Sequence, residues 1–513
     1  MEVFPKMFPT DTDIETKITL ETEAMPIDEE SPFHILILGD WSGRESRSST
    51  ALSLGPIEID RDNFDDVLRK LNVGLNLKFQ GSGETALSLN FTELDDFHPD
   101  KIFQQLPLFA DLRGVRQRLV KADTFDEAAR EVRSWLVDDE NSEGMQSKKE
   151  VISSELSQPV PDDLLDQILG KTDAESSTTK NKNVEQSELS AFIGKLVRPH
   201  IIQTDTAEQS RLLMIVDEVT SDLMRKILHH PQFQALESAW RGIYLLVRRI
   251  ETDTFLKLFL FDISKDELAA NLKSVNNLSD SDIYRTLFEK TVEPWAVVCG
   301  NYTFGLNVDD VSILIRLAKL GNAIDAPFIS HIEPEMFGFK SFASASALDN
   351  WQIVENSVEG KLWETLRAIP DSKYLGMALP RFLARLPYGK QTDPTENFYF
   401  EEFTSSQEHE QYLWANPSFI CALLFAQSFH QFGWNLISNF RQDVDGLPLY
   451  LCKVDNEAKT KPCAEITMSE SNYEKLLNQG LISLISFRDT DKVRLGGLQS
   501  LAYPPSGLSG RWK

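Results

Sequence analysis

Cysteine is scarce in this chain of 513 residues, which contains only Cys299, Cys421, Cys452 and Cys463. No CxxC pair occurs, so the sequence supports neither a zinc ribbon nor a disulfide framework. Cys452 and Cys463 are close enough in sequence to meet across a hairpin as a redox pair. Reduced thiols in the cytosol are the simpler interpretation of all four.

Positive charge is also in deficit, with 52 Lys and Arg residues against 79 Asp and Glu residues and a net charge of −27. Such a field repels nucleic acid and anionic membranes, and we expect neither as a partner. A basic protein partner would be compatible with it.

Long hydrophobic runs are missing. The most apolar span, 419–426 (FICALLFA), is far shorter than the ~20 residues that a membrane helix needs. The N-terminal sequence lacks the basic and apolar regions of a signal peptide. We therefore expect a soluble, cytoplasmic protein.

Motifs for metal binding are absent as well. His229 and His230 lie near Glu237, but adjacent histidines point in different directions on a helix, and no HExxH spacing occurs. The acidic clusters Asp60/Asp62 and Asp95/Asp96 could bind a hard cation. Helix capping and the helix dipole explain them more simply, and we predict no metal ligands.

No catalytic constellation is evident either, and we predict no catalytic residues, no cofactor and no enzyme activity. The loop GDWSGRES at 39–46 lacks the GK[ST] ending of a phosphate-binding loop, and no GxSxG elbow occurs. Arg381, Arg385 and Lys390 could form an anion pocket or pair with the surplus carboxylates, which is the commoner outcome. A phosphate-binding enzyme is accordingly the least favoured alternative.

Apolar periodicity alternates between strand-like and helix-like segments, which predicts a mixed α/β fold. We expect strands near 33–38, 57–59, 87–91, 255–263, 296–299, 447–450 and 464–468. We expect helices near 64–71, 102–106, 108–119, 189–201, 212–228, 231–247, 265–272, 313–324 and 419–434, with Asp309 and Asp310 capping the helix at 313–324.

The stretch His229–Tyr244 is the most informative helix. Pro231 fits a first helical turn, and the apolar residues that follow, including Trp240, recur at helical spacing. Glu237 and Arg241 lie four residues apart on a neighbouring face, in the orientation that stabilises a helix.

Composition divides the chain. We expect a flexible arm at 1–30, a folded domain at 31–137, a polar linker at 138–190, a larger folded domain at 191–490 and a flexible tail at 491–513. Within the linker, 161–170 carries the apolar stripe Leu164, Leu165, Ile168 and Leu169. Such a short helix is unstable alone, so it either docks on its own protein or is a recognition peptide for another.

Long motifs in the two domains carry a family resemblance. HHPQFQALESAWRGIYLLV, DISKDEL, NYTFG, YLGMALPRFLARLPYG, FEEF and YLWANPSF resemble the large subunit of the contractile sheath of type VI secretion systems. FHILILGDWSGR, IEIDRDNFDDVL, LNFTELDDFHPDKIFQQLP and LRGVRQRL resemble its small subunit. The matches cover about residues 30–135 and 160–490, so the chain resembles a fusion of the small subunit followed by the large one.

The resemblance implies two intertwined α/β domains with a mechanical, non-catalytic role in contraction-driven protein secretion. Its implied partners are sheath subunits, either copies of this chain or separate small and large subunits, with the inner tube protein and the baseplate as further candidates. An AAA+ unfoldase that recycles the sheath is implied to grasp the helix at 161–170. Candidate core or assembly residues are Trp240, Phe337, Arg381 and Trp414.

One departure from the family concerns the C-terminus. Family large subunits continue into a region that faces the inner tube, whereas this sequence stops at Lys513 after a tail rich in Gly, Pro and Ser. A sheath protomer is therefore one hypothesis, and an accessory, capping or adaptor protein that binds the sheath without forming it is the other.

Overall fold

The computed structural model describes residues 31–47, 55–78, 86–121, 123–137, 208–289, 291, 293–338, 341–342, 357–404, 409–454 and 457–512. The predicted arm at 1–30 and the predicted linker helix with Leu164, Leu165, Ile168 and Leu169 lie outside these residues. None of the helices within the described ranges is both long and apolar enough to cross a membrane.

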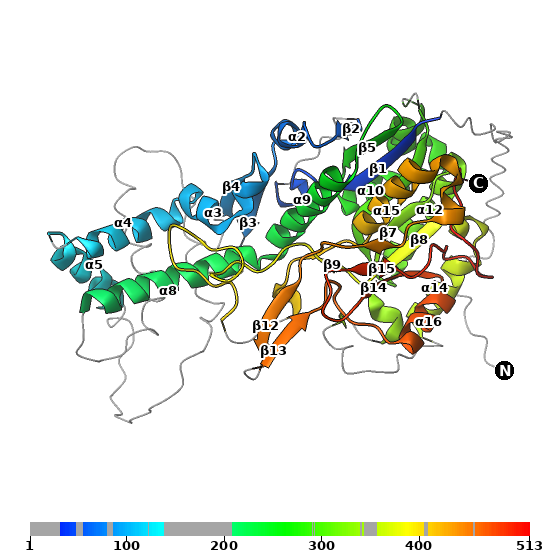
Figure 1. Ribbon diagram of the computed structural model, residues 1–513. Coiled ribbons are helices and arrows are strands. Elements are labelled where there is room, and N and C mark those ends of the chain that lie inside the picture. The colour runs from blue at the N-terminus through cyan, green and yellow to red at the C-terminus, as the bar shows by residue number, and fades with distance from the viewer. Residues whose placement is uncertain are drawn as a thin grey trace, which may run out of the picture.

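Nine strands of the described residues form one mixed sheet in the order β11-β15-β14-β8-β7-β6-β1-β5-β2 (Figure 1). The strands from β5 to β14 along this order are mutually parallel. At the edges, β2 is antiparallel to β5, β15 is antiparallel to β14, and β11 is antiparallel to β15. Their bounds are β1 Phe33–Gly39, β2 Ile57–Ile59, β5 Leu256–Asp262, β6 Trp295–Phe304, β7 Phe328–Ile332, β8 Leu375–Leu379, β11 Asp443–Val444, β14 Leu481–Ser486 and β15 Val493–Leu495.

Strand β1 comes from the N-terminal domain, yet it lies between two strands of the C-terminal domain. Ile35 pairs with Leu258 of β5 on one side and with Val297 of β6 on the other. Every residue of β1 is buried, as expected for a strand inside a parallel sheet that is covered on both faces. The predicted mixed α/β class is confirmed, and the two domains share one sheet.

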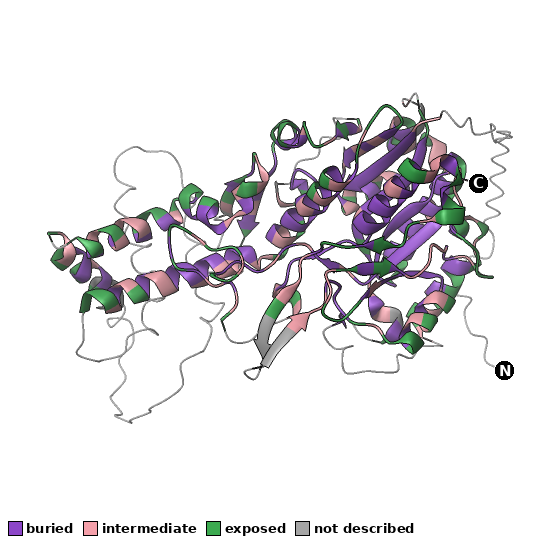
Figure 2. Ribbon diagram, in the orientation of Figure 1, coloured by how far each residue is buried: buried purple, intermediate pink, exposed green. Residues whose placement is uncertain are grey.

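Side chains of β1 alternate between two hydrophobic cores. Ile35 and Ile37 belong to the core on the face covered by α9 and α15, whereas Leu36 and Leu38 belong to the core under α10, α12 and α14. These helices are α9 Pro231–Arg249, α15 Ser418–Phe432, α10 Lys265–Lys273, α12 Val308–Ile324 and α14 Val358–Ala368, with α2 Phe64–Leu71 and α16 Glu470–Asn478 packed beside them. Figure 2 shows the sheet and its covering helices as the largest buried part of the molecule.

Three long helices extend away from this body as an arm: α4 Leu108–Val120, α5 Phe125–Val137 and α8 Glu208–Leu228 (Figure 1). At the base of the arm lie the two-stranded sheet β3 Gly74–Lys78 and β4 Ala86–Asn90, and the helices η1 Leu94–Phe97 and α3 Pro99–Gln105. Helix α8 leads into α9, so the arm is continuous in sequence with the helix that covers the sheet.

The hairpin of β12 Tyr450–Val454 and β13 Glu457–Lys461 projects from the body (Figure 1). The remaining short elements are β9 Phe382–Leu383, β10 Trp414–Ala415, α1 Arg44–Arg47, η3 Leu278–Asp280, α11 Asp282–Tyr284, η4 Arg285–Glu289, η5 Pro334–Phe337, η6 Pro370–Tyr374, η7 His409–Gln411 and η8 Gly433–Asn439.

Two local predictions near the C-terminus are wrong. Of the expected strands at 447–450 and 464–468, only Tyr450 lies in a strand, because the residues between them pair with each other as the hairpin β12–β13. The hairpin pairs Cys452 with Lys459, while Cys463 lies beyond its end as a buried free thiol. The two cysteines are therefore not brought opposite each other.

The expected flexible tail is also wrong for the described residues up to 512. Leu501 and Leu508 are buried, and the ring of Trp512 stacks 4.9 Å from that of Phe425. The Gly, Pro and Ser content breaks regular structure there, but widely spaced apolar side chains still anchor the segment to the body.

The cap of α12 differs in detail from the prediction. Asn307, not Asp309 or Asp310, is the N-cap residue, and its side chain accepts a hydrogen bond from the backbone N–H of Asp310. The two aspartates lie in the first turn, where negative charge favours the helix dipole.

Candidate functional site

The N-terminal domain meets the C-terminal one at a junction around α9. Helix α9 begins as predicted: Pro231 occupies its first turn and His230 caps it by accepting a hydrogen bond from the Gln232 N–H. His230 Nε2 also lies 3.1 Å from the Lys78 carbonyl oxygen. Among the described residues, no group of three His, Cys, Asp or Glu side chains is placed to hold a metal ion.

Aromatic rings fill one side of the junction. The indole N–H of Trp240 donates to the Trp41 carbonyl over 2.9 Å, and the two indoles lie edge to face. Phe64 stands perpendicular to Trp240 at 5.6 Å, and Phe97 packs against Phe233 of α9. Because Trp41, Phe64 and Phe97 belong to the N-terminal domain, this packing ties the two domains through a dry aromatic interface.

The neighbouring face of α9 touches α15 very closely at Gly242. A β-carbon at this position would lie 2.4 Å from the ring of Phe419. Glycine is therefore required by space, and it lets the two helices approach each other over the sheet.

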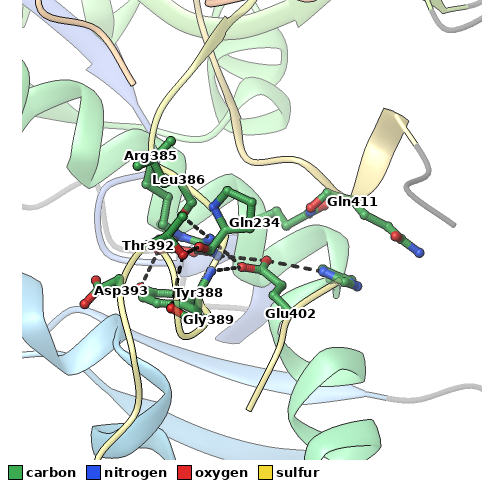
Figure 3. A network of polar contacts seen from close by, with 12 residues as sticks. Gln234, Arg385, Leu386, Tyr388, Gly389, Thr392, Asp393, Glu402 and Gln411 are labelled. Carbon is green, nitrogen blue, oxygen red and sulfur yellow. Dashed lines mark hydrogen bonds and ion pairs between the residues drawn. The ribbon is translucent and has the colours of Figure 1, made fainter. Parts of the chain in front are cut away.

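Charged side chains fill the other side of the junction (Figure 3). Arg385 binds Glu237 of α9 through Nε at 2.7 Å, and it binds Glu402 through Nη1 at 2.7 Å. Its Nη2 donates to both carboxylates over 3.2 Å. All three side chains are at most 7% exposed, so the ion pairs are almost fully removed from water.

Further partners complete this buried network. Arg241 binds Glu237 and donates to the Tyr388 hydroxyl, each over 2.8 Å. The Tyr388 backbone N–H donates to Glu402, and His229 Nε2 lies 3.3 Å from the same carboxylate. Two guanidinium groups thus balance two carboxylates, and most of their hydrogen-bonding positions are filled.

The pKa values of the network residues are shifted by these contacts. Burial alone would raise the pKa of Glu402, but the Arg385 charge and the hydrogen bond from His229 lower it to about 2. The carboxylates keep the pKa of Arg385 well above its usual value despite its burial. Burial raises the pKa of the Tyr388 hydroxyl, which therefore stays a hydrogen-bond donor.

The N-terminal domain also holds the loop that carries Glu402. The carboxylate of Asp100 accepts hydrogen bonds from the backbone N–H groups of Glu396 and Asn397 over 2.8 and 3.0 Å. Phe103 stacks on Phe398 with 4.7 Å between ring centroids. The network of the C-terminal domain is thus completed by contacts from residues about 300 positions earlier in the chain.

The hypothesis of an anion pocket at Arg381, Arg385 and Lys390 is wrong, because both arginines are already paired. Arg381 Nη2 lies 2.6 Å from Glu465 and 3.1 Å from Glu410. Burial would raise the pKa of Glu465, but Arg381 and His409 hold it well below its usual range. The alternative, pairing with carboxylates, is what the structure shows.

The glycine loop after β1 is likewise not arranged for phosphate. The Asp262 carboxylate accepts hydrogen bonds from the N–H groups of Trp41 and Ser42, and Arg44 binds Glu267 over 2.9 Å. Negative side chains thus already occupy the donors that a phosphate would need.

The four candidate core or assembly residues do not form one site. Trp240 lies in the junction, and Arg381 lies in the neighbouring ion-pair group with Glu465. Trp414 of β10 packs in a small cluster with Leu383 and Tyr412, and Phe337 is buried in the core on the opposite face of the sheet. Trp240, Phe337 and Trp414 are buried aromatic side chains. None of the contacts described for the four residues bears on a role in assembly.

Glu402 and the partnership of Glu237 with Arg385 were not predicted. Helical spacing places Glu237 on a face beside the apolar one, paired with Arg241. That pair exists, but Glu237 is fully buried. A signal was present in NFYFEEF, where a carboxylate stands inside an aromatic run, since a buried Glu needs a cationic partner elsewhere in the chain.

Comparison with known proteins gives two family matches and one similar curated protein. Residues 210–502 match the family described as VipB: EvpB/VC_A0108, tail sheath N-terminal domain. Residues 13–150 match the family described as type VI secretion system, VipA, VC_A0107 or Hcp2. The type VI secretion system sheath protein TssC1 of Pseudomonas aeruginosa is 35% identical over 306 residues, which are 57% of this chain and 61% of that protein.

Proposed function

Because the chain belongs to the VipB tail sheath family of type VI secretion systems, we propose that it is a structural protomer of the contractile sheath, with the small-subunit and large-subunit regions joined in one polypeptide. The chain spans about three fifths of the length of the relative that it matches, so the proposal extends from that relative's name to this protein. The role is mechanical and not catalytic.

One observation carries this proposal: β1 of the VipA-like region lies inside the sheet of the VipB-like region. A sheath transmits force from one protomer to the next, so its two parts must not slide against each other. Strand β1 prevents sliding by hydrogen bonds to β5 and β6, and the contacts of Asp100 and Phe103 with the loop at 396–398 tie the two regions together a second time.

The proposed setting follows the family. The protomer packs against further sheath subunits in the cytoplasm. The sheath that they form surrounds an inner tube that stands on a baseplate. A recycling AAA+ unfoldase would recognise the segment 161–170 through its leucine and isoleucine stripe. The net charge of −27 favours partners whose contact surfaces are basic.

Electron microscopy of the purified chain, alone and mixed with sheath subunits from the same cell, tests the proposal. We expect long tubes, either from the chain alone or from the mixture with the chain distributed along their length. Labelled chain found only at tube ends would support the accessory or capping alternative. Failure to bind any sheath component in either sample would contradict both readings.

A further inference from the structure

The arm and the body are joined by a turn that consists of two histidines. Only His229 and His230 lie between the end of α8 and the start of α9, and the chain changes direction there (Figure 1). The backbone N–H of His229 donates to the Arg225 carbonyl and that of His230 to the Ile227 carbonyl, so the hydrogen bonding of α8 continues into the turn. We call these two histidines the hinge turn.

The two rings of the hinge turn bind to different parts of the molecule. His229 Nε2 lies 3.3 Å from the Glu402 carboxylate. His230 is bound on both sides of its ring: Nδ1 accepts a hydrogen bond from the Gln232 N–H over 3.3 Å, and Nε2 lies 3.1 Å from the Lys78 carbonyl oxygen. His230 therefore connects the start of α9 with the end of β3, a strand of the N-terminal domain.

These two contacts determine which nitrogen of His230 carries the proton. A backbone N–H can only donate, so Nδ1 must be the acceptor, and a carbonyl oxygen can only accept, so Nε2 must carry the hydrogen. The neutral ring thus makes both bonds at once. A second proton, taken from solvent, binds at Nδ1 and turns this acceptor into a donor that faces the Gln232 N–H. It also places a positive charge at the N-terminus of α9, which the helix dipole disfavours.

The charged and titratable groups of the segments that meet at the hinge turn are Lys78, Arg225, His229 and Glu402. The Lys78 side chain is exposed, Arg225 is paired with acidic residues of its own helix, and Glu402 is already bound by Arg385. Burial lowers the pKa of His230, and the hydrogen bond to the Lys78 carbonyl offsets this only in part. The folded state therefore favours the neutral ring. The stability that this ring gives is full above the ordinary histidine pKa of about 6.5 and is lost as the pH falls below it.

We propose that His230 makes the hinge turn between the arm and the body sensitive to protons. The neutral ring holds the start of α9 and the end of β3 together. The protonated ring keeps its bond to the Lys78 carbonyl, because Nε2 still donates, but it releases the first turn of α9. Mild acid thus loosens the hinge turn at a pH where the Glu402 carboxylate of the junction is still ionised. This inference does not depend on the proposed sheath function, because it concerns the isolated chain.

Hydrogen–deuterium exchange of the full chain, read by mass spectrometry at about pH 7.5 and about pH 5, tests the proposal. The informative variant is His230→Asn, because asparagine is a strong N-cap residue that does not titrate. The parent protein and the variant are compared with each other at each pH, so the pH dependence of the chemical exchange rate cancels. We expect exchange at residues 232–236 of the parent, relative to the variant, to rise about fivefold between the two pH values, as the loss of one helix cap predicts.

Two further variants serve as controls. His230→Ala has no cap at either pH and should exchange rapidly at 232–236 already at about pH 7.5. His430→Asn removes an exposed histidine in the last turn of α15, where it caps no helix N-terminus, and should keep the full rise of the parent protein. Peptides covering 74–78 should not show the rise, because the charged ring still donates to Lys78.

Three results would overturn the proposal. One is a ratio of parent to His230→Asn exchange at 232–236 that stays constant between the two pH values. Another is equally slow exchange of His230→Ala and the parent protein at about pH 7.5, which would show that the ring does not hold the first turn of α9. The third is a rise that is also lost in His430→Asn or that appears equally at 74–78, which would assign it to a general effect of acid on the fold.

Discussion

The junction around α9 and the helical arm differ in how their ion pairs are held. At the junction around α9, the ion pairs of Arg385 with Glu237 and Glu402 are almost completely buried and share their partners. In the arm, Arg116 of α4 binds Asp217 of α8 with 36% and 21% of the side chains exposed. The junction is a fixed joint, whereas the arm is held mainly by apolar helix packing with charged groups at its margin.

The two kinds of ion pair differ in energy because they differ in their exposure to water. An exposed pair competes with water and salt and is worth little, whereas a buried charge that loses its partner cannot be rehydrated. Displacing Arg385 from Glu237 and Glu402 at the junction would separate buried charges, so the free-energy cost rises steeply there. Separating Arg116 from Asp217 in the arm would cost much less.

The largest expected effect comes from removing the central cation of the junction. Arg385→Met leaves Glu237 and Glu402 buried together, and we expect a loss of about 3–5 kcal/mol in the free energy of unfolding, measured by urea titration. Arg116→Met, the matched change in the arm, should cost less than about 1 kcal/mol.

If Arg385→Met fails to fold, the double variant Arg385→Met/Glu402→Gln recovers part of the stability, because one uncompensated charge is gone. Equal effects of Arg385→Met and Arg116→Met would show that the junction is no more rigid than the arm.

Acid should weaken the junction in a defined pH range. The pKa of Glu402 is about 2 in the folded protein and about 4.3 in an unfolded chain, so the folded state favours the ionised form. The stability from this group is fully present above about pH 5 and is lost as the pH falls toward 2. The stability difference between the parent protein and Glu402→Gln, followed by urea unfolding, should shrink as the pH is lowered from 5 to 2.5. A difference that is constant over this range would exclude Glu402 as the responsive group.

Two glycine substitutions compare the packing of both regions with the same chemical change. Gly242→Ala places a methyl group against the Phe419 ring and should destabilise the protein by about 1–3 kcal/mol. Gly114→Ala in α4 has no atom within 4 Å of the new group and should stabilise by about 0.5–1 kcal/mol through helix propensity. Thermal unfolding of both variants checks the opposite signs, and a shift of the same sign in both would argue against a tighter junction.

Local elements could be predicted from the sequence where apolar spacing is strong. The run FHILIL predicted β1, and the spacing from Phe233 to Tyr244 predicted α9 together with its start at Pro231. Capping chemistry was equally informative: Ser264 and Glu267 form the expected capping box of α10. Each of these signals lies within a few residues of chain.

Long-range pairing could not be predicted in this way. Nothing in FHILIL specifies that β1 lies between β5 and β6, because a buried apolar strand fits many neighbours. Arg385 and Glu237 are 148 residues apart, and periodicity carries no information on such a pair. The wrong tail prediction has the same origin: Leu501, Leu508 and Trp512 are anchored by surfaces that are distant in sequence.

The central position of β1 has a consequence for how the chain folds. The backbone N–H of Trp41, two residues after β1, donates a hydrogen bond to Asp262, which is 221 residues further along the chain. The middle of the sheet is thus built from contacts of very high sequence separation, which slow folding. During synthesis β1 emerges first, and it must wait unpaired until both of its neighbours have been translated. Joining the two regions in one polypeptide keeps this strand at high effective concentration when β5 and β6 arrive, so each sheet receives its own central strand.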